Sequence, residues 1–499
     1  MIGLSKAFAT RRLRSLEQRL SKDESVKKQY HDFLHEYITL GHMAAVQEAE
    51  EDDAKACYLP HHPVLKESSS TTKVRVVFDG SAKTSSGHSL NDSLLVGPVV
   101  QDDLLSLILR FRKFPVALVA DIEKMYRQVS MHPQDRPLQR ILWRFHASEP
   151  IQTYELGTVT YGLAPSSFLA TRTLLQLVED EGCPFPKASA AIKKNVYVDD
   201  LIGGADSTEE AIQLREELGD LLQKCGFRFR KWCSNSLPVL AGLSPDELGM
   251  QSSMKFDPDE SIKTLGIRWE PEADVFRFDF SVTVKDQPPT KRLILSAIAQ
   301  LYDPLGVISP VVVEAKVLMQ NLWLQTLGWD DVVSPDLQLR WTQFCEQLPH
   351  LTNFRLERFA FASGFQSAEL HCFADSSETA YGACIYVRSE AADGHVQVSL
   401  LASKSRVAPL SSTNIPRLEL CAALLASRLY EKIVNALDME FQASFFWSDS
   451  TIVLQWLKAP PRTWKTFVAN RIAEIQATTV GSHWQHVAGK ENPADMVSR

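Results

Sequence analysis

The pattern of apolar and polar positions changes several times along the chain. Residues 1–50 have apolar positions at helical spacing among many Glu and Lys side chains, which predicts amphipathic helix. From about residue 57, short apolar runs bounded by Pro, Ser and Gly predict strands. A buried strand at 115–122, a strand, tight turn and strand at 193–207, and a long helix at 208–227 follow. This order predicts an α+β sheet with helices packed against it.

The second half of the chain has a different organisation. Residues 241–290 are mixed and acidic, and residues 291–331 predict two helices interrupted at the sequence DPLG. A variable linker is expected near 355–367. Beyond it, two strands around a turn, the helix 415–437 and a further strand that runs into a helix predict a separate unit.

Composition narrows the class of protein. A chain of 499 residues is too long for one core, and about three folded units are expected. The apolar fraction of 44% and the charged fraction of 23% are ordinary for a soluble globular protein. No apolar run approaches the roughly 18 residues that span a bilayer, and the N-terminus has no apolar block followed by a cleavage site. Eight scattered cysteines without metal-type spacing favour reduced thiols inside a cell.

Net charge leaves the choice of partner open. The value of −8 counts mildly against a protein that binds nucleic acid. Basic clusters near residues 11, 110 and 224 nevertheless concentrate positive charge locally. Carboxylates gathered to hold metal ions would also lower the total, so an acidic chain is compatible with a metal-dependent site.

Three acids lie where predicted strands end: Asp121, and the adjacent Asp199 and Asp200 at the tip of a hairpin. A two-residue hairpin turn normally uses Asn-Gly or Asp-Gly, because the tip requires positive φ, so Asp-Asp is a poor turn. Such a pair alone is more often a solvated acidic turn without a role. Converging carboxylates are, however, what two-metal phosphoryl transfer needs, since Mg²⁺ prefers oxygen ligands and offsets the repulsion between the acids.

Further motifs lie in order around this pair. The segments are KVRVVFDGSAK, ADIEKMYRQV, YGLAPSSFLATR, NVYVDDLIGG, CGFRFRKW and TLGIRW. Alone, each has a structural explanation: a surface charge, a core tyrosine, a turn glycine or a solvated basic face. Together, with YVDD at their centre, they resemble reverse transcriptases.

The resemblance implies a role for each motif residue. Asp121, Asp199 and Asp200 would be catalytic and would bind metal, and Tyr126 would exclude a ribose 2′-hydroxyl. The residues implied to bind the incoming nucleotide are Lys73, Arg75, Tyr126, Gly162 and Lys231. The residues implied to form a primer grip are Leu265 and Gly266.

Two longer stretches are closer to one group of elements. HHPVLKESSSTTKVRVVFDGSAKTSSGHSLNDSLLVGP and LYDPLGVISPVVVEAK resemble the BEL/Pao class of long-terminal-repeat retrotransposon, whose central region often carries a peptidase family name. The similarity runs from about residue 15 to the end. It implies an α+β right-hand polymerase with fingers, palm and thumb, followed by a connecting region and an α/β ribonuclease H-like domain. The expected boundaries are an N-terminal helical segment at 1–50, fingers and palm at 51–240, thumb and connection at 241–355, a linker at 356–367 and the ribonuclease H-like domain at 368–499.

A second set of acids lies beyond the linker: Asp375 after a strand, Glu419 in a helix, Asp449 at the end of a strand, and Asp495 near the C-terminus. Helix capping would explain single members of the set, since ADSSE and SDST are ordinary helix starts. The order strand-Asp, helix-Glu, strand-Asp and late Asp resembles ribonuclease H, and the glycine-bearing strand TAYGACIYV adds to the likeness. The resemblance implies four catalytic carboxylates that bind two Mg²⁺ ions, with His486 assisting proton transfer or product release.

Two departures limit the resemblance. The chain stops at ADMVSR, four residues after Asp495, so the helix that this acid would open barely begins, and a fragment of a longer polyprotein is expected. DGS at Asp79 and DSS at Asp375 do not fit the Asp-Thr/Ser-Gly triplet of an aspartic peptidase, and the zinc pattern of an integrase is absent from the sequence. Peptidase and integrase modules are therefore expected elsewhere in the polyprotein.

The resulting hypothesis is an RNA-directed DNA polymerase joined to ribonuclease H. The implied partners are an RNA template, a DNA primer, RNA–DNA hybrid and deoxynucleoside triphosphates (dNTPs), with no membrane partner. The implied cofactor is Mg²⁺, two ions per active site, with Mn²⁺ as a substitute, and the expected location is the cytoplasm, in a virus-like particle, or the nucleus. The alternatives are a decayed or domesticated element that acts as a nucleic-acid-binding scaffold, a peptidase, and a polymerase with an inactive nuclease.

Overall fold

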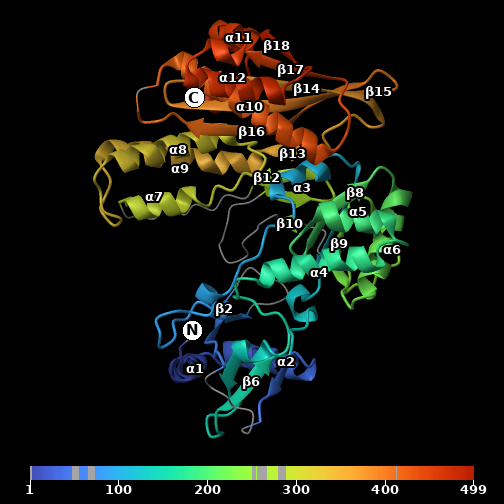
Figure 1. The fold of residues 1–499 in the computed structure, drawn as a ribbon, viewed down its shortest axis with the longest axis vertical. Coiled ribbons are helices and arrows are strands. Elements are labelled where there is room, and N and C mark those ends of the chain that lie inside the picture. Colours follow the sequence, from blue (N-terminus) through green and yellow to red (C-terminus); the bar gives the residue numbers. More distant parts are fainter. Residues whose placement is uncertain are drawn as a thin grey trace. The chain divides into compact units, whose positions relative to one another are not determined.

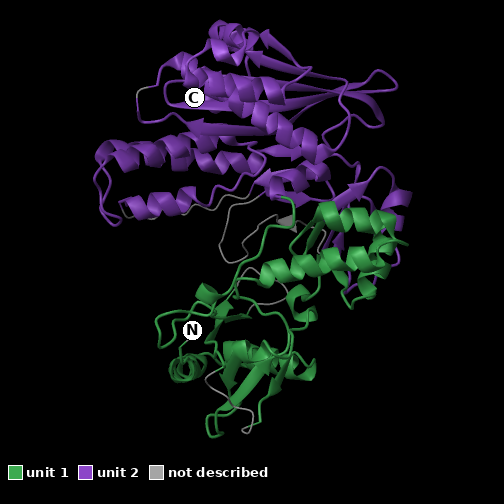
Figure 2. Cartoon of the chain, viewed as in Figure 1, with its two compact units in different colours: residues 1–102, 121–201, 214–230 green, residues 103–120, 202–213, 231–499 purple. Residues whose placement is uncertain are grey.

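The computed structural model describes residues 3–47, 55–65, 74–249, 254–255, 267–278, 288–411 and 413–499. The chain divides into two compact units, each assembled from separated segments (Figure 2). The first unit comprises residues 1–102, 121–201 and 214–230, and the second comprises 103–120, 202–213 and 231–499. Among the helices described, none is long and apolar enough to cross a membrane.

The first unit begins with two helices that pack on a small sheet (Figure 1). α1 (Lys6–Leu20) and α2 (Glu24–Thr39) each bury one face, as their apolar periodicity predicts. Asp23 caps α2 by accepting a hydrogen bond from Val26 N at 3.0 Å. The sheet has the order β1-β6-β5, formed by β1 (Met43–Ala45), β6 (Gln152–Leu156) and β5 (Arg140–Trp143).

A two-stranded antiparallel sheet of β2 (His61–Leu65) and β3 (Val74–Phe78) joins the same core. The imidazole of His61 lies between two polar atoms: its Nε2 donates to the main-chain oxygen of Leu142 at 3.0 Å, and its Nδ1 accepts from the hydroxyl of Tyr30. Burial lowers the pKa of His61 to about 4. The ring is therefore neutral and behaves as a satisfied core residue.

Four strands form a further sheet in the order β7-β8-β4-β9. They are β7 (Val196–Tyr197), β8 (Asp200–Ala205), β4 (Val116–Ile122) and β9 (Phe229–Cys233). The associated helices are α3 (Leu104–Phe111), α4 (Ser166–Glu181), α5 (Pro186–Asn195) and α6 (Thr208–Gln223). The strand predicted to start at residue 193 is wrong in extent, because α5 continues to Asn195. The sequence PKASAAIKK is rich in helix-forming residues, with Pro at the first helical position, and this local preference outweighs the strand pattern.

The second unit contains a five-stranded mixed sheet with the order β16-β15-β14-β17-β18 (Figure 1). β14 (Phe365–Ser376), β15 (Ala380–Ala391) and β16 (Val396–Val407) are antiparallel neighbours. β17 (Ala443–Ser448) runs parallel to β14, and β18 (His483–His486) runs parallel to β17. The helices are α10 (Ile415–Leu437), α11 (Thr451–Lys458), α12 (Thr466–Thr478) and α13 (Asp495–Ser498). α10 packs against β14 and β15, and α12 packs on α10.

Three helices and a smaller sheet precede this one in the chain. α7 (Lys291–Ile298), α8 (Ser309–Leu324) and α9 (Pro335–Gln347) share one apolar core. The interruption between α7 and α8 contains the DPLG sequence, as predicted. The sheet has the order β10-β11-β12-β13, formed by β10 (Met254–Lys255), β11 (Ile267–Glu270), β12 (Val275–Phe278) and β13 (Arg355–Glu357).

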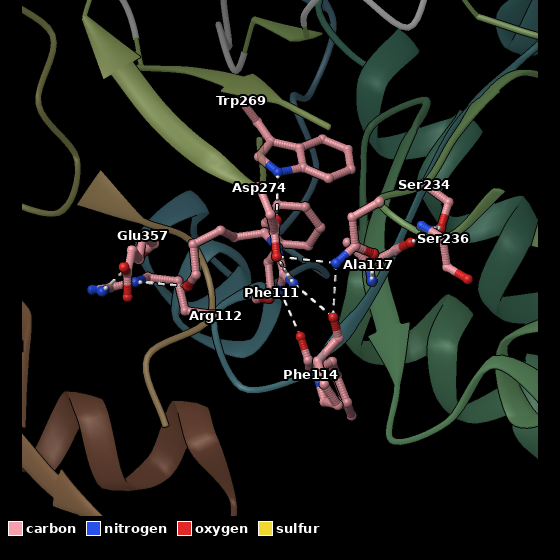
Figure 3. A network of polar contacts seen from close by, with 12 residues as sticks. Phe111, Arg112, Phe114, Ala117, Ser234, Ser236, Trp269, Asp274 and Glu357 are labelled. Carbon is pink, nitrogen blue, oxygen red and sulfur yellow. Dashed lines mark hydrogen bonds and ion pairs between the residues drawn. The ribbon is translucent and has the colours of Figure 1, made fainter. Parts of the chain in front are cut away.

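Two fully buried arginines connect distant segments of the second unit (Figure 3). Arg358 pairs with Asp274 through two contacts, Nε–Oδ1 at 2.6 Å and Nη2–Oδ2 at 2.8 Å. It also donates to the main-chain oxygens of Phe111, Phe114 and Pro115. Arg112 donates to the main-chain oxygens of Glu357, Arg358, Leu400 and Leu401. The network therefore joins the segment before β4 to the turn before β12, to the end of β13 with the residue that follows it, and to β16.

The stretch 356–367, predicted to be a variable linker, has several residues that are enclosed within the second unit. Arg358, Ala360, Phe361 and Ala362 are fully buried, and β14 already begins at Phe365. The sequence ERFAFASGF has no long apolar run, so its burial depends on partners that lie far away in the chain. A local pattern contains no information about such partners.

Candidate active sites

A cluster of three carboxylates lies at one edge of the five-stranded sheet. Asp375 is on β14, Glu419 is on α10, and Asp449 directly follows β17. One ligand oxygen from each lies within 4.8 Å of the others. Within the described part of the chain, no other group of three His, Cys, Asp or Glu side chains gathers this closely.

Strand register explains why the two aspartates meet. β14 and β17 are parallel, and their register pairs Ala374 with Ser448. Asp375 and Asp449 each come directly after this pair in the chain, so they lie side by side at the same end of the two strands. Glu419 reaches them from the helix that covers β14 and β15.

Burial makes the charged form of the cluster costly. Asp375 is 3% exposed and Glu419 is 6% exposed. Burial, together with the neighbouring charges of Asp375 and Asp449, raises the pKa of Glu419 to about 8, although hydrogen bonds from Ser376 act in the opposite direction. Burial likewise raises the pKa of Asp375 to about 6, with contributions from Asp449 and Asp495. Carboxylates held together in this way favour a proton or a cation.

Neighbouring polar side chains, which the sequence motifs did not indicate, hold the cluster in place. Ser376 Oγ donates to Glu419 Oε1 at 2.8 Å, and Ser498 Oγ donates to Asp375 Oδ2. Asn492 Nδ2 donates to the main-chain oxygen of Ala374 at 3.0 Å. Ser376 is in the ADSSE sequence next to the first acid, which is the only local signal of its role.

The donor set fits a divalent cation. Glu419 Oε2 is buried and has no hydrogen-bond partner within the described residues, so one acceptor of the three carboxylates is left unsatisfied. Three oxygen donors with converging negative charge are the ligands that Mg²⁺ and similar hard cations take, and a cation would offset the mutual repulsion.

Two further residues predicted for this site lie at its margin. Asp495 begins α13 and forms an ion pair with Arg499, with Nε–Oδ1 at 2.7 Å. Its charge contributes to the raised pKa of Asp375, but it is not a member of the tight group of three. His486 ends β18 in register with Ser448 and is exposed.

The Asp-Asp hairpin of the first unit has a different tip from the one predicted. β7 and β8 pair Val196 with Leu201 and Tyr197 with Asp200, so the two turn residues are Val198 and Asp199. Val198 has a φ of +56°, which is a rare conformation for a β-branched residue. Positive φ at the first turn position matches a type II′ turn, where Gly is usual. The unfavourable positive φ predicted for the hairpin tip is therefore present, but Val198 adopts it and not an aspartate.

Hydrogen bonds fix this hairpin against its neighbours. Val198 N donates to Gln101 Oε1 at 3.0 Å, which helps to hold the strained turn. Ile122 N donates to the main-chain oxygen of Asp199 at 2.7 Å, so the turn lies beside the end of β4, where Asp121 is half-buried. Asp121, Asp199 and Asp200 do not form a carboxylate group as tight as the one in the second unit.

The tyrosine of the first palm motif lies in the same region. Tyr126 packs on Tyr161, with ring centroids 4.9 Å apart, and hydrogen-bonds Ser167. Burial raises the pKa of Tyr126, and the charge of Asp199 raises it further. Burial also raises the pKa of Tyr161 to about 12, with smaller effects from the charges of Asp199 and Arg75, among others. These electrostatic effects place Arg75, an exposed residue of β3, and Asp199 within range of one tyrosine pair.

Gly162 lies where the turn that contains it passes close to the end of β3. Its φ is +90°, and a Cβ at this position would lie 2.1 Å from the main-chain oxygen of Phe78. Asn91 bridges to the same turn, because its Nδ2 donates to Gly162 O at 2.9 Å and its Oδ1 accepts from Ala164 N at 2.9 Å. The SLNDS sequence thus contributes a residue, Asn91, that fixes this turn.

The remaining predicted residues are not part of either cluster as described. Lys231, at a φ of +55° on β9, is exposed and belongs to the second unit. Lys73, Leu265 and Gly266 lie outside the described residues. The roles proposed for these four stay predictions.

Comparison with known proteins shows that part of the chain is similar to one family. Residues 290–450 match the family model of the Pao retrotransposon-like RNaseH-like domain. This match to the Pao family confirms the resemblance found in the sequence, and the matched residues include all three clustered carboxylates, with Asp449 next to the end of the match. Domains of the RNaseH-like type use divalent metals, in keeping with the donor set of the cluster. No curated protein sequence matches the chain.

Two solved structures resemble nearly the whole chain. One is a foamy viral protease-reverse transcriptase dRH in complex with ds DNA, with 14% identity and a TM-score of 0.56 over 92% of this chain and 68% of that one. The other is a foamy viral protease-reverse transcriptase in complex with RNA/DNA hybrid, with 13% identity and a TM-score of 0.56 over 94% of this chain and 54% of that one. The chain thus spans about half the length of the second structure. At these identities the likeness concerns the fold, and it confirms the predicted α+β polymerase and ribonuclease H-like architecture.

Proposed function

We propose that the second unit cleaves the RNA strand of an RNA–DNA hybrid at the cluster of Asp375, Glu419 and Asp449. The observation that carries this proposal is the convergence of three carboxylates, with one buried acceptor on Glu419 left unsatisfied. Such an arrangement is unfavourable without a cation and suits a metal-dependent hydrolase.

The protein side chains would position the reacting groups. The three carboxylates would hold Mg²⁺, with Mn²⁺ as a substitute, and Asp495 would complete a second position from the start of α13. Ser376 and Ser498 would keep Glu419 and Asp375 from rotating away. The bound cations would supply an activated water and would stabilise the leaving oxygen.

We also propose that the first unit extends a DNA primer on an RNA or DNA template with dNTPs. A separate observation favours this activity: the strained Val198–Asp199 turn lies beside the end of β4, which carries Asp121. Asp121 and Asp199 would be the principal metal ligands, with Asp200 alongside. Arg75 would contact the triphosphate, and Tyr126 would exclude the 2′-hydroxyl of a ribonucleotide. The structures of similar fold contain ds DNA and RNA/DNA hybrid, which supports nucleic acid as the partner.

The whole chain would then be the reverse transcriptase and ribonuclease H segment of a BEL/Pao retrotransposon. Its peptidase and integrase would lie elsewhere in the polyprotein, and it would act in the cytoplasm within a virus-like particle, or in the nucleus. Lys and Arg contacts to phosphates would hold the template and primer without reading their sequence.

Two assays on the purified chain test these proposals. An end-labelled RNA·DNA hybrid should be cut with Mg²⁺ or Mn²⁺ and left intact with EDTA. A labelled DNA primer on an RNA template should be extended with dNTPs under the same conditions. A chain that binds both substrates but alters neither would instead be a nucleic-acid-binding scaffold, and extension without cleavage would indicate an inactive nuclease.

A further inference from the structure

A groove of about 280 Å³ runs along α10 in the second unit, beside the carboxylate cluster but separate from it. Residues from α10, from α12 and from the ends of β15 and β16 form its walls. The lining residues are Tyr381, Arg406, Cys421, Leu424, Leu425, Arg428, Asn470, Arg471 and Glu474.

The groove is positively charged, in contrast to the chain as a whole. Three arginines line it, and the one carboxylate among the lining residues is Glu474. That carboxylate is already engaged by Arg428 through two contacts, Nε–Oε1 and Nη2–Oε2, the second at 2.9 Å. Arg406 and Arg471 therefore leave a net charge of about +2 in a protein whose net charge is −8.

The guanidinium of Arg471 is fixed but incompletely satisfied. It lies 3.6 Å from the centroid of the Phe467 ring, and its Nη1 donates to the main-chain oxygen of Phe467 at 2.9 Å. Its Nε is buried and has no hydrogen-bond partner among the described residues. A buried donor without a partner is costly, so the Arg471 guanidinium retains unused hydrogen-bonding capacity.

The groove adjoins the acidic cluster. Tyr381 is paired across the sheet with Ser376, the residue that donates to Glu419. A polynucleotide strand with one phosphate at the groove would therefore have its neighbouring linkages next to the carboxylates.

We propose that this groove binds a backbone phosphate of the polynucleotide that the neighbouring carboxylates act on, with Arg406 and Arg471 as the principal ligands. The proposal rests on the nuclease function proposed above. Arginine forks match phosphate oxygens with two parallel hydrogen bonds, and Asn470 offers a neutral donor beside them. Leu424 and Leu425 provide an apolar wall for a sugar, and a volume equal to roughly nine waters leaves room for more than a phosphate group.

The experiment compares the double variant Arg406→Gln/Arg471→Gln with a matched control. Arg388→Gln removes the same charge from β15, but seven residues from Tyr381, so that its side chain leaves the opposite face of the strand. Binding of a fluorescent RNA·DNA hybrid is measured in EDTA at several salt concentrations, and cleavage is measured with Mg²⁺.

The double variant is expected to bind the hybrid about tenfold more weakly and to have a KM about tenfold higher, with kcat within about twofold of the wild type. The slope of log K against log salt should become shallower by about 0.9 for each lost phosphate contact. Arg406→Lys/Arg471→Lys should retain most of the slope, because charge is kept, and Arg388→Gln should behave as the wild type does.

Three outcomes would overturn the proposal. If the double variant binds and cleaves hybrid as the wild type does, the groove is not a substrate subsite. If inorganic phosphate binds the wild type and not the variant, as measured by calorimetry, while hybrid binding is unchanged, the ligand is a free anion and not a backbone. A wild-type chain that neither binds nor cleaves hybrid would instead defeat the nuclease function and this proposal together.

Folding is checked separately. Circular dichroism should give the same thermal transition for each variant. Arg406 is exposed on β16, so Arg406→Gln alone still tests the groove if the loss of Arg471 from its ring contact unfolds α12.

Discussion

The two acidic sites of this chain are built in opposite ways. In the second unit, parallel strands in register and a covering helix bring three carboxylates within 4.8 Å in a buried position. In the first unit, Asp121, Asp199 and Asp200 are half-buried and less tightly gathered, and the unusual feature is in the backbone, at Val198. The nuclease-type site is therefore preorganised by side-chain packing, whereas the hairpin site is preorganised by a constrained turn.

The difference indicates where each site stores unfavourable free energy. Buried like charges destabilise the second unit until a cation or proton arrives. A positive φ at a β-branched residue costs on the order of 1–3 kcal/mol and holds one turn position regardless of ions. Substitutions that remove one kind of cost should leave the other site unaffected.

The largest expected effect is that each of two variants loses one activity and keeps the other. Asp449→Asn should reduce hybrid cleavage by about a thousandfold, because the loss of one metal-binding charge costs roughly 4 kcal/mol of transition-state stabilisation, and primer extension should persist. Asp199→Asn should do the reverse. Both are measured with the two labelled-substrate assays on the same preparations.

Loss of both activities in a single variant would contradict the independence of the two sites. If either variant loses both activities while its thermal transition is unchanged, the two sites are not independent. Extension at near wild-type rate by Asp199→Asn would remove that residue from the proposed polymerase site.

The second effect concerns stability without metal. Glu419→Gln keeps the acceptor for Ser376 and removes the cost of protonating this carboxyl, or of burying its charge, when the chain folds at neutral pH. In EDTA we therefore expect the unfolding temperature of the second unit to rise by a few degrees, corresponding to about 1–2 kcal/mol. Added Mg²⁺ should stabilise the wild type and have less effect on the variant. Differential scanning calorimetry gives both values, and Glu431→Gln, an exposed glutamate of the same helix, is the control.

A lower unfolding temperature for Glu419→Gln in EDTA would contradict this account. The cluster would then be stabilised by its own hydrogen bonds, and its convergence would need no cation.

The smallest effect is expected at the hairpin. Val198→Gly should stabilise the first unit by up to about 1 kcal/mol, because relief of the positive φ outweighs the added entropy of the unfolded chain. Primer extension should nevertheless fall severalfold, since a more mobile turn positions Asp199 less well. Urea unfolding and the extension assay test the two halves, and Val77→Gly, on the regular strand β3, should only destabilise.

Much of the nuclease-type site was predictable from residue order. Acids that follow two adjacent parallel strands lie at the same end of the sheet, where a residue of the intervening helix can reach them. Asp375, Asp449 and Glu419 meet in this way. The supporting hydroxyls of Ser376 and Ser498 were not predictable, because a serine that bonds a partner more than 40 residues away looks like any other serine. The hairpin illustrates the same limit, since the sequence indicated a difficult turn but not which residue adopts the positive φ.

The second-unit core was harder to predict for the same reason. The stretch around Arg358 looked like a linker because its partners, Asp274 and the main chain near Phe111, are remote in sequence. Charged residues in a short polar stretch usually lie in water, and only the folded chain shows that this one is enclosed.

The arginine pair of the second unit also implies an uneven tolerance to sequence drift. Apart from Asp274, every hydrogen-bond acceptor described for Arg112 and Arg358 is a main-chain oxygen. Any amino acid supplies such an oxygen, so the positions that receive these bonds can change their side chains as a lineage diverges. The two donors have no such freedom, because no other side chain presents five N–H groups in one plane. A comparison of distant descendants of this sequence should therefore find the two arginines retained, while the residues whose main-chain oxygens accept their hydrogen bonds have changed identity.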